Sequence, residues 1–255
     1  MDYHITIFHA LALVVAGVIA GFINTLAGGG SMLTLPALMM FGMPANIANA
    51  TNRVGVVLQS LAGVKAFKDK DRLDSTAIIP ILVPTLAGAL AGSLAASYLP
   101  VYLLKPTLLG TMVAMALVMV VRPGVVAPPP GTTPARVQDK PMAAAGLFFA
   151  GLYGGFVQAG VGFILIAALA GGLRYDLVRS NALKLVCTGV FSVLALAVFV
   201  ARDQVLWVPG LLLAVGTMAG ATLSVRFAIQ VPQTTLKWIL FVMVSITCGA
   251  ALFYG

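Results

Sequence analysis

Long apolar runs recur along the whole chain, with short polar connections between them. They include Ile5–Ala27, Ala77–Leu99, Leu108–Val121, Ala182–Ala201 and Leu206–Val225. A helix of roughly 20 apolar residues crosses about 30 Å of hydrocarbon, so these runs are typical of membrane helices. The pattern predicts an all-α polytopic membrane protein whose surrounding partner is a lipid bilayer.

The apolar runs divide into five expected segments in each half of the chain. The first half has Ile5–Ala27, Ser31–Phe41, Ala48–Phe67, Ser75–Tyr98 and Leu104–Val121; the second has Ala143–Ala159, Phe163–Gly172, Leu177–Ala201, Leu206–Ala228 and Leu236–Phe253. The second segment of each half is too short to cross a bilayer alone. We expect both short segments to be half-helices of broken or re-entrant elements.

A proline-rich stretch lies between the halves. Pro128, Pro129 and Pro130 are consecutive and cannot continue a helix. We therefore interpret residues 1–121 as a first transmembrane repeat, 122–141 as a cytoplasmic linker and 142–255 as a second transmembrane repeat.

The halves resemble each other at one constant separation, which indicates a duplication. The pairs lie 132 positions apart: Gly28 with Gly160, Gly30 with Gly162, Asn49 with Asn181, Ser60 with Ser192 and Pro100 with Pro232. A second pattern, Gly88 and Gly92 against Gly216 and Gly220, recurs with a four-residue shift. These glycines pack helices either within one subunit or between the two subunits of a homodimer.

The charges predict the topology. The net charge is +8, and the basic residues gather in loops that the positive-inside rule places in the cytoplasm, so we expect no nucleic-acid partner. An odd number of crossings per half makes the second half enter from the opposite face. The sequence thus predicts two inverted repeats, which are typical of secondary transporters.

Several kinds of chemistry are missing from the expected membrane segments. The chain has no glutamate, its seven aspartates lie in loops or termini, and His4 and His9 lie near the start of the chain. This excludes a buried carboxylate proton relay and a metal site, and we expect no cofactor. Ser31 has no neighbouring base, so we expect no enzyme activity and no catalytic residue. Cys187 and Cys248 are interpreted as small packing residues.

Arg53 and Lys184 are the cations expected inside the membrane, near the starts of matching segments. Polar residues share a helix face with each: Asn49, Asn52 and Ser60 in the first half, and Asn181, Thr188 and Ser192 in the second. A charge at membrane depth indicates a functional site. The alternative is that both cations extend to the interfaces and the asparagines cap helices.

Glycine-rich breaks precede both short segments. The first contains Asn24, Gly28, Gly29, Gly30 and Ser31, and the second contains Gln158, Gly160 and Gly162. Glycine lets the backbone leave helical geometry, and the half-helix that follows points its positive dipole end at the break. Matching breaks in two halves indicate a transport site, whereas close helix packing is the structural alternative.

Backbone amides, asparagines and cations together favour a small anionic substrate. Two alternatives remain open. A passive anion channel is possible because the membrane segments offer no evident proton relay, and a non-transporting subunit that anchors partners would leave the repeated polar breaks unexplained.

The motif from Gly21 to Ser31, with Leu35–Leu38 and Ala48–Thr51, resembles the TauE/SafE family of sulfite exporters. The resemblance continues through Gly160–Ile164 and covers nearly the whole chain. It implies a multi-pass permease of the bacterial or archaeal cytoplasmic membrane for sulfite, sulfoacetate or related sulfur-containing anions. Asn52 matches Lys184 across the duplication, so we expect two unequal half-sites.

Our leading hypothesis is therefore a transporter, expected to be an exporter, of small sulfur-containing anions such as sulfite or organosulfonates, which rocks one half against the other. A permease for a different small anion is a further alternative. The backbone and side-chain amides of the two glycine breaks would donate hydrogen bonds to the anion, and Arg53 and Lys184 would supply positive charge. The path would be lined by Asn49, Asn52, Asn181 and Ser192.

Overall fold

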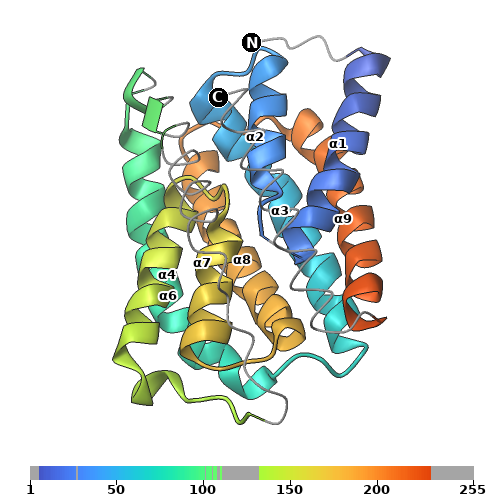
Figure 1. The fold of residues 1–255 in the computed structure, drawn as a ribbon. Coiled ribbons are helices and arrows are strands. Elements are labelled where there is room, and N and C mark those ends of the chain that lie inside the picture. Colours follow the sequence, from blue (N-terminus) through green and yellow to red (C-terminus); the bar gives the residue numbers. More distant parts are fainter. Residues whose placement is uncertain are drawn as a thin grey trace.

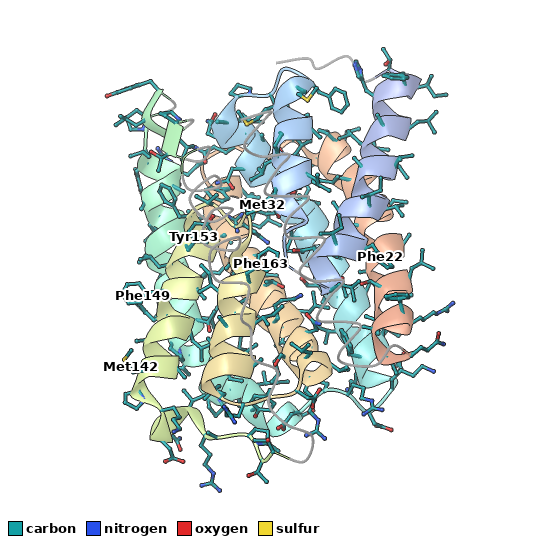
Figure 2. All side chains as sticks on the ribbon, viewed as in Figure 1. Phe22, Met32, Met142, Phe149, Tyr153 and Phe163 are labelled. Carbon is teal, nitrogen blue, oxygen red and sulfur yellow. The ribbon has the colours of Figure 1, made fainter. Side chains whose placement is uncertain are left out.

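The computed structural model describes residues 6–26, 28–100, 102–104, 106–107, 110 and 132–230, and all regular structure within them is helical. Figure 1 shows how the helices are arranged, and Figure 2 shows their side chains in the same view. The elements are α1 (Ile7–Leu26), α2 (Ser31–Met40), α3 (Ala45–Lys68), η1 (Ser75–Ala77), α4 (Ile78–Tyr98), η2 (Val137–Asp139), α6 (Pro141–Phe156), α7 (Val161–Ile166), η3 (Ala167–Gly172), α8 (Leu177–Val200) and α9 (Trp207–Gln230).

Four of these helical stretches are long and apolar enough to cross a membrane. They are Ile7–Leu26, Ser75–Tyr98, Leu177–Val200 and Trp207–Gln230. With the helical content of the described residues, they confirm the predicted all-α polytopic membrane protein. The predicted segments Leu104–Val121 and Leu236–Phe253 lie largely or wholly outside the described residues.

Helix α3 is also long, with 24 residues, but it is much less apolar than the four candidate spans. Its polar side chains are buried, among them Asn49, Asn52, Arg53 and Gln59. They need no contact with lipid, because α3 packs against α8 on one side and α9 on the other. The protein therefore shields its most polar helix with apolar ones.

Both short segments return toward the end from which their preceding helix came (Figure 1). Helix α1 runs into the middle of the molecule, and α2 turns back toward the end where α1 begins; α6 and α7 do the same from the opposite end. The predicted start of the first half-helix, Ser31, is correct. The second begins at Val161, two residues before the predicted Phe163, and continues as the π-helix η3.

The halves pack on each other through glycines. A Cβ on Gly88 of α4 would lie 2.0 Å from the carbonyl oxygen of Phe148 in α6. A Cβ on Gly216 of α9 would lie 2.1 Å from that of Val14 in α1. These glycines let helix backbones approach closely within one subunit, α4 on α6 and α9 on α1.

Basic residues gather at one end, the lower end in Figure 1, which we call the basic end. The last turn of α3, the α3–α4 connection, η2 and the start of α6, the η3–α8 connection, the first turn of α8 and the C-terminal part of α9 lie there. The basic residues of these parts are Lys65, Lys68, Lys70, Arg72, Arg136, Lys140, Arg174, Arg179 and Arg226. The opposite end carries Arg202, in the α8–α9 connection, while Arg122 and Lys105 lie outside the described residues.

Candidate functional site

The two glycine breaks meet in the middle of the protein. A Cβ on Gly28 would lie 2.3 Å from the Cα of Gly162, and a Cβ on Gly162 would lie 2.3 Å from the Cα of Gly28. No side chain fits at either position. Gly28 and Gly160 also have φ values of +96° and +78°, which favour glycine. The contact thus explains why glycine occurs in both breaks.

Arg53 reaches from α3 of the first half into the break of the second. Its Nη1 donates to the carbonyl oxygen of Gly154 at 2.5 Å and to Oε1 of Gln158. Its Nη2 donates to the carbonyl oxygen of Gly155 at 3.0 Å and to Oδ1 of Asn49 at 3.4 Å. The guanidinium therefore holds the carbonyl end of α6.

Lys184 reaches from α8 of the second half into the break of the first. Its Nζ donates to the carbonyl oxygens of Asn24 at 2.8 Å and Thr25 at 2.7 Å, both at the end of α1. A third bond runs to Oδ1 of Asn181 at 2.7 Å. Lys184 thus holds the carbonyl end of α1 as Arg53 holds that of α6.

Both cations are fully enclosed, with 0% of Arg53 and 1% of Lys184 exposed. The alternative in which they extend to the membrane interfaces is therefore wrong. The last carbonyls of a helix have no partner within it and carry the negative end of its dipole, so they are suitable ligands for a buried cation.

The asparagines connect the long helices to the breaks. Asn49 Nδ2 donates to the carbonyl oxygen of Phe156 at 2.9 Å. Asn52 accepts from Thr34 Oγ1 at 2.7 Å and donates to Ser31 Oγ at 3.1 Å, which fixes the start of α2. Three of the asparagines in the predicted polar faces, Asn49, Asn52 and Asn181, therefore bind at or beside the breaks.

Gln158 lies at the centre of the second break. Its Oε1 accepts from Arg53 and from Ser192 Oγ, the latter at 3.1 Å. Its φ is +69°, an uncommon conformation for a residue with a side chain. Ser60 and Thr188 instead bond to each other at 3.2 Å and contact neither cation through a hydrogen bond.

The predicted residues are therefore largely brought together, although some act through different atoms. Asn24 binds Lys184 through its backbone carbonyl. Gly29 and Gly30 are buried beside Gly28. The predictions missed Gly154, Gly155 and Thr25, whose carbonyls bind the cations, and Phe199, whose ring centroid lies 5.6 Å from Cζ of Arg53. The adjacent glycines at 154 and 155 were the available signal.

Hydrogen-bond donors without a partner surround this network. Among the described residues, the buried side-chain atoms that lack one include Nε of Arg53, Nε2 of Gln158 and Nδ2 of Asn181. The side-chain amides of Gln158 and Asn181 are oriented by Arg53 and Lys184, because only the amide oxygen can accept a hydrogen bond from a cation. Buried donors without acceptors are rare, and they indicate a place where an acceptor can bind.

The network is closed to both ends of the described protein. Asn24 is the most exposed of the predicted polar side chains, at 6%. Any ion that reaches Arg53 or Lys184 therefore requires movement of the surrounding helices.

Comparisons with known proteins agree with a membrane transporter. The family model described as sulfite exporter TauE/SafE matches residues 13–251. A "probable membrane transporter protein" of Haemophilus influenzae is 28% identical over 230 residues, covering 89% of this chain and 88% of that protein.

Two further relatives carry similar descriptions. "Probable membrane transporter protein ORF9" of a Sinorhizobium species is 28% identical over 248 residues, covering 96% of this chain and 93% of the relative. "Probable membrane transporter protein YfcA" of Escherichia coli K12 is 26% identical over 244 residues, covering 92% and 86%. No solved structure matches the chain. With the glycine breaks and helical architecture described above, the family match over nearly the whole length shows that this chain belongs to the TauE/SafE family of membrane transporters.

Proposed function

We propose that this protein is a secondary transporter that exports a small sulfur oxyanion, such as sulfite or an organosulfonate. The observation that carries the proposal is the group of buried N–H donors without partners on Arg53, Gln158 and Asn181, around two enclosed cations. Such a group requires acceptor oxygens, and an oxyanion supplies several at once.

The charge balance supports an anion over a cation. No carboxylate lies among the buried residues that the structure describes, so Arg53 and Lys184 have neutral partners only. Helix C-termini offset part of the cost of burying them, because each carries roughly half a negative charge. A small anion between the half-sites would offset more, whereas a cation would be repelled.

The sulfur chemistry comes from the family's description as sulfite exporters. The three relatives are described only as probable membrane transporters, so they support transport without a substrate. An oxyanion with a pyramidal or tetrahedral head has several oxygens, which suits donors supplied by α3, by α8 and by the break before α7.

Alternating access between inverted halves is the mechanism that these contacts support. The hairpins α1–α2 and α6–α7 enter from opposite ends in Figure 1. Each is held by a cation from the other half, so movement between the halves changes both half-sites together. The basic end would be cytoplasmic by the positive-inside rule, in a bacterial inner membrane. The closed network favours a carrier over a permanently open channel.

The test is sulfite flux in proteoliposomes with Gln158→Glu. This change keeps the acceptor for Arg53 and Ser192 but replaces the unpaired Nε2 donor with a second oxygen and adds a negative charge. We expect the protein to fold and transport to fall at least about tenfold, equivalent to roughly 1.4 kcal/mol. Gln204→Glu is the matched control, because Gln204 lies in the α8–α9 connection, where its Nε2 donates to the Ser97 carbonyl.

Flux at the wild-type rate in Gln158→Glu would contradict the anion site. Counterflow separates the mechanisms: a carrier is accelerated by sulfite on the opposite side, whereas a channel conducts without exchange. Absence of counterflow with intact conductance would replace the carrier with a channel.

A further inference from the structure

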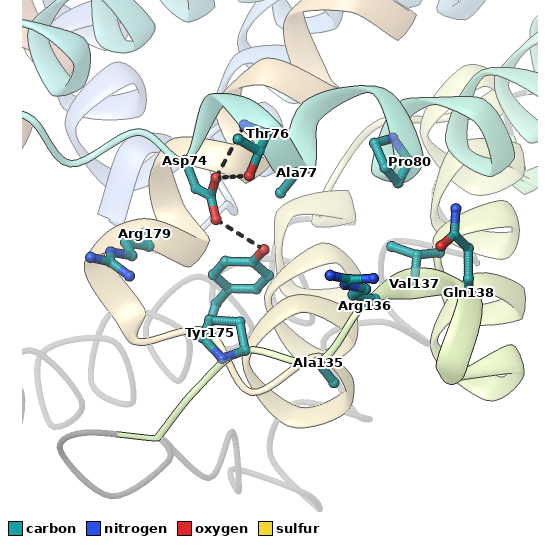
Figure 3. Close-up of a pocket in the computed structure, with 11 residues that line it drawn as sticks. Asp74, Thr76, Ala77, Pro80, Ala135, Arg136, Val137, Gln138, Tyr175 and Arg179 are labelled. Carbon is teal, nitrogen blue, oxygen red and sulfur yellow. Dashed lines mark hydrogen bonds between the residues drawn. The ribbon is translucent and has the colours of Figure 1, made fainter.

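A second site lies at the basic end, away from the glycine breaks. It is a pocket of about 430 Å³, within the size range of small-molecule sites and far larger than an inorganic oxyanion needs. Figure 3 shows its lining side chains, with Arg136 and Arg179 on either side of the Tyr175 ring in this view. The proposed transport function does not use this pocket.

Three parts of the chain build the pocket. Asp74, Thr76, Ala77 and Pro80 come from the start of the first half's α4 region, Pro134 to Gln138 from the segment before α6, and Tyr175 and Arg179 from the second half. A hydrogen bond from the backbone N of Ala135 to the carbonyl oxygen of Leu173, 2.8 Å long, joins the last two. A molecule bound here would contact both halves.

The cations of the pocket have capacity for a ligand. Within the described residues, the guanidinium of Arg136 has no hydrogen bond or ion pair, although its backbone carbonyl accepts from the backbone N of Asp139. Arg179 has a loose ion pair with Asp176, 3.6 Å long, and half of its side chain is exposed. Guanidinium groups bind oxyanion head groups through paired N–H bonds.

The acidic group in the pocket is already engaged. Oδ1 of Asp74 accepts from the backbone N and the hydroxyl of Thr76, at 3.1 and 2.7 Å, and Oδ2 accepts from the Tyr175 hydroxyl at 3.3 Å. The Thr76 hydroxyl bond is the main cause that lowers the pKa of Asp74. Burial, then the charge of Asp74, raises the pKa of Tyr175 to about 12, so the phenol stays a donor at neutral pH.

Two helix N-termini near the pocket are already capped by carboxylates. Asp74 caps the turn that opens the α4 region, and Asp176 caps α8, accepting from the backbone N of Arg179 at 2.9 Å. The attraction for an anion therefore comes from the two arginines. The apolar walls formed by Pro80, Pro134 and Val137 suit a carbon body attached to the anionic head.

We propose that this pocket binds an organic anion with a phosphate or sulfonate head group, and that the bound anion holds the two halves together at the basic end. The head group contacts Arg136 and Arg179, and the carbon body lies against the proline walls. The clamping effect on flux rests on the proposed transport function, whereas the binding itself does not.

The binding test uses the full chain in detergent and isothermal titration calorimetry at constant ionic strength. The probes are glycerol 3-phosphate and ethanesulfonate, which separate the two head groups, and inorganic sulfate as the head group alone. We expect one organic probe to bind saturably and more tightly than sulfate, and to bind about tenfold more weakly to Arg136→Gln with Arg179→Gln.

The matched control is Lys140→Gln with Arg226→Gln, which removes the same charge from the same end outside the pocket. Equal weakening in both double variants would overturn the site in favour of general surface charge, as would absence of saturable binding by either organic probe. In proteoliposomes, glycerol 3-phosphate, which is outside the proposed substrate class, is expected to slow sulfite flux in the wild type but not in the pocket variant. Binding that leaves wild-type flux unchanged would overturn the clamp while leaving the transport proposal intact.

Discussion

The half-site around Arg53 and the half-site around Lys184 perform one structural task with different numbers of donors. A guanidinium has five N–H groups, and four of those on Arg53 bond to Gly154, Gly155, Gln158 and Asn49. An ammonium has three, and all of those on Lys184 are used. Arg53 therefore keeps one N–H group without a partner, whereas Lys184 uses all of its donors and its neighbour Asn181 keeps an unpaired Nδ2.

This difference teaches that the two half-sites, although built alike, leave different donors without a partner. Asn49 and Asn181 are paired in the predicted repeat, and each accepts from the cation of its own half. The cations themselves differ by one position, because Lys184 matches Asn52. The two half-sites are thus alike in the kind of partner that each cation binds, the carbonyls at the end of a helix, but differ in which N–H donors have no partner.

The largest expected effect comes from breaking the contact between the half-sites. In Gly162→Ala, the new Cβ would lie 2.3 Å from Cα of Gly28 and 3.1 Å from Cδ of Lys184, so the backbones must separate. Overpacking of this kind costs about 1–3 kcal/mol or more, and we expect a clear fall in the thermal unfolding midpoint in detergent with loss of flux. Gly171→Ala, where a Cβ meets nothing within 4 Å, is the control. Equal midpoints for the two variants would contradict the contact.

Arg53→Lys tests the unequal donor count. A lysine at this position has three donors for four acceptors and none for a substrate, so carbonyls of α6 lose partners. We expect sulfite flux to fall about 10- to 100-fold, in line with roughly 1–3 kcal/mol for unsatisfied buried groups. Retained flux in Arg53→Lys would show that the fifth donor is not used.

Asn181→Asp sharpens the role of the Lys184 half-site. The new carboxylate still accepts from Nζ of Lys184. The substitution removes the unpaired Nδ2 donor, and the negative charge of the carboxylate neutralises the positive charge of Lys184. We expect flux to fall about tenfold, with an unfolding midpoint equal to or above that of the wild type, since the bond becomes an ion pair. A variant that transports normally would assign anion contact to the Arg53 half-site alone.

Ser192→Ala gives the smallest expected effect. It removes one of the two donors to Oε1 of Gln158, and Arg53 still holds that oxygen. A single hydrogen bond contributes about 0.5–1.5 kcal/mol to stability, so we expect a small fall in midpoint and flux within about threefold of the wild type. Thr188→Val breaks the nearby Ser60–Thr188 bond and is the comparison. A larger loss of flux for Thr188→Val than for Ser192→Ala would place the path along the Ser60–Thr188 pair.

The sequence predicts much of this architecture because apolar length, glycine and buried charge leave clear signals. The glycine breaks, the start of α2 and the two cations follow from these alone. The partners of the cations do not follow from the sequence. They are backbone carbonyls, those of Gly154, Gly155, Asn24 and Thr25, and because every residue has a backbone carbonyl, no side chain marks these four. The π-helix after α7 was likewise missed, since its residues are ordinary small and apolar ones.

Each half supplies the cation that holds the hairpin of the other half, and this arrangement affects which solutes could leak through the protein. The carbonyl oxygens that hold Arg53 and Lys184 are the same kind of ligand as the oxygens of an oxyanion, so in the proposed transport an arriving oxyanion would compete with the backbone for the same N–H groups. Release of a hairpin and capture of an oxyanion would then be one replacement of an oxygen acceptor by another. We expect chloride, which has no oxygens, to compete less well for these bonds, so that selectivity would depend on breaking the bonds that hold the hairpins.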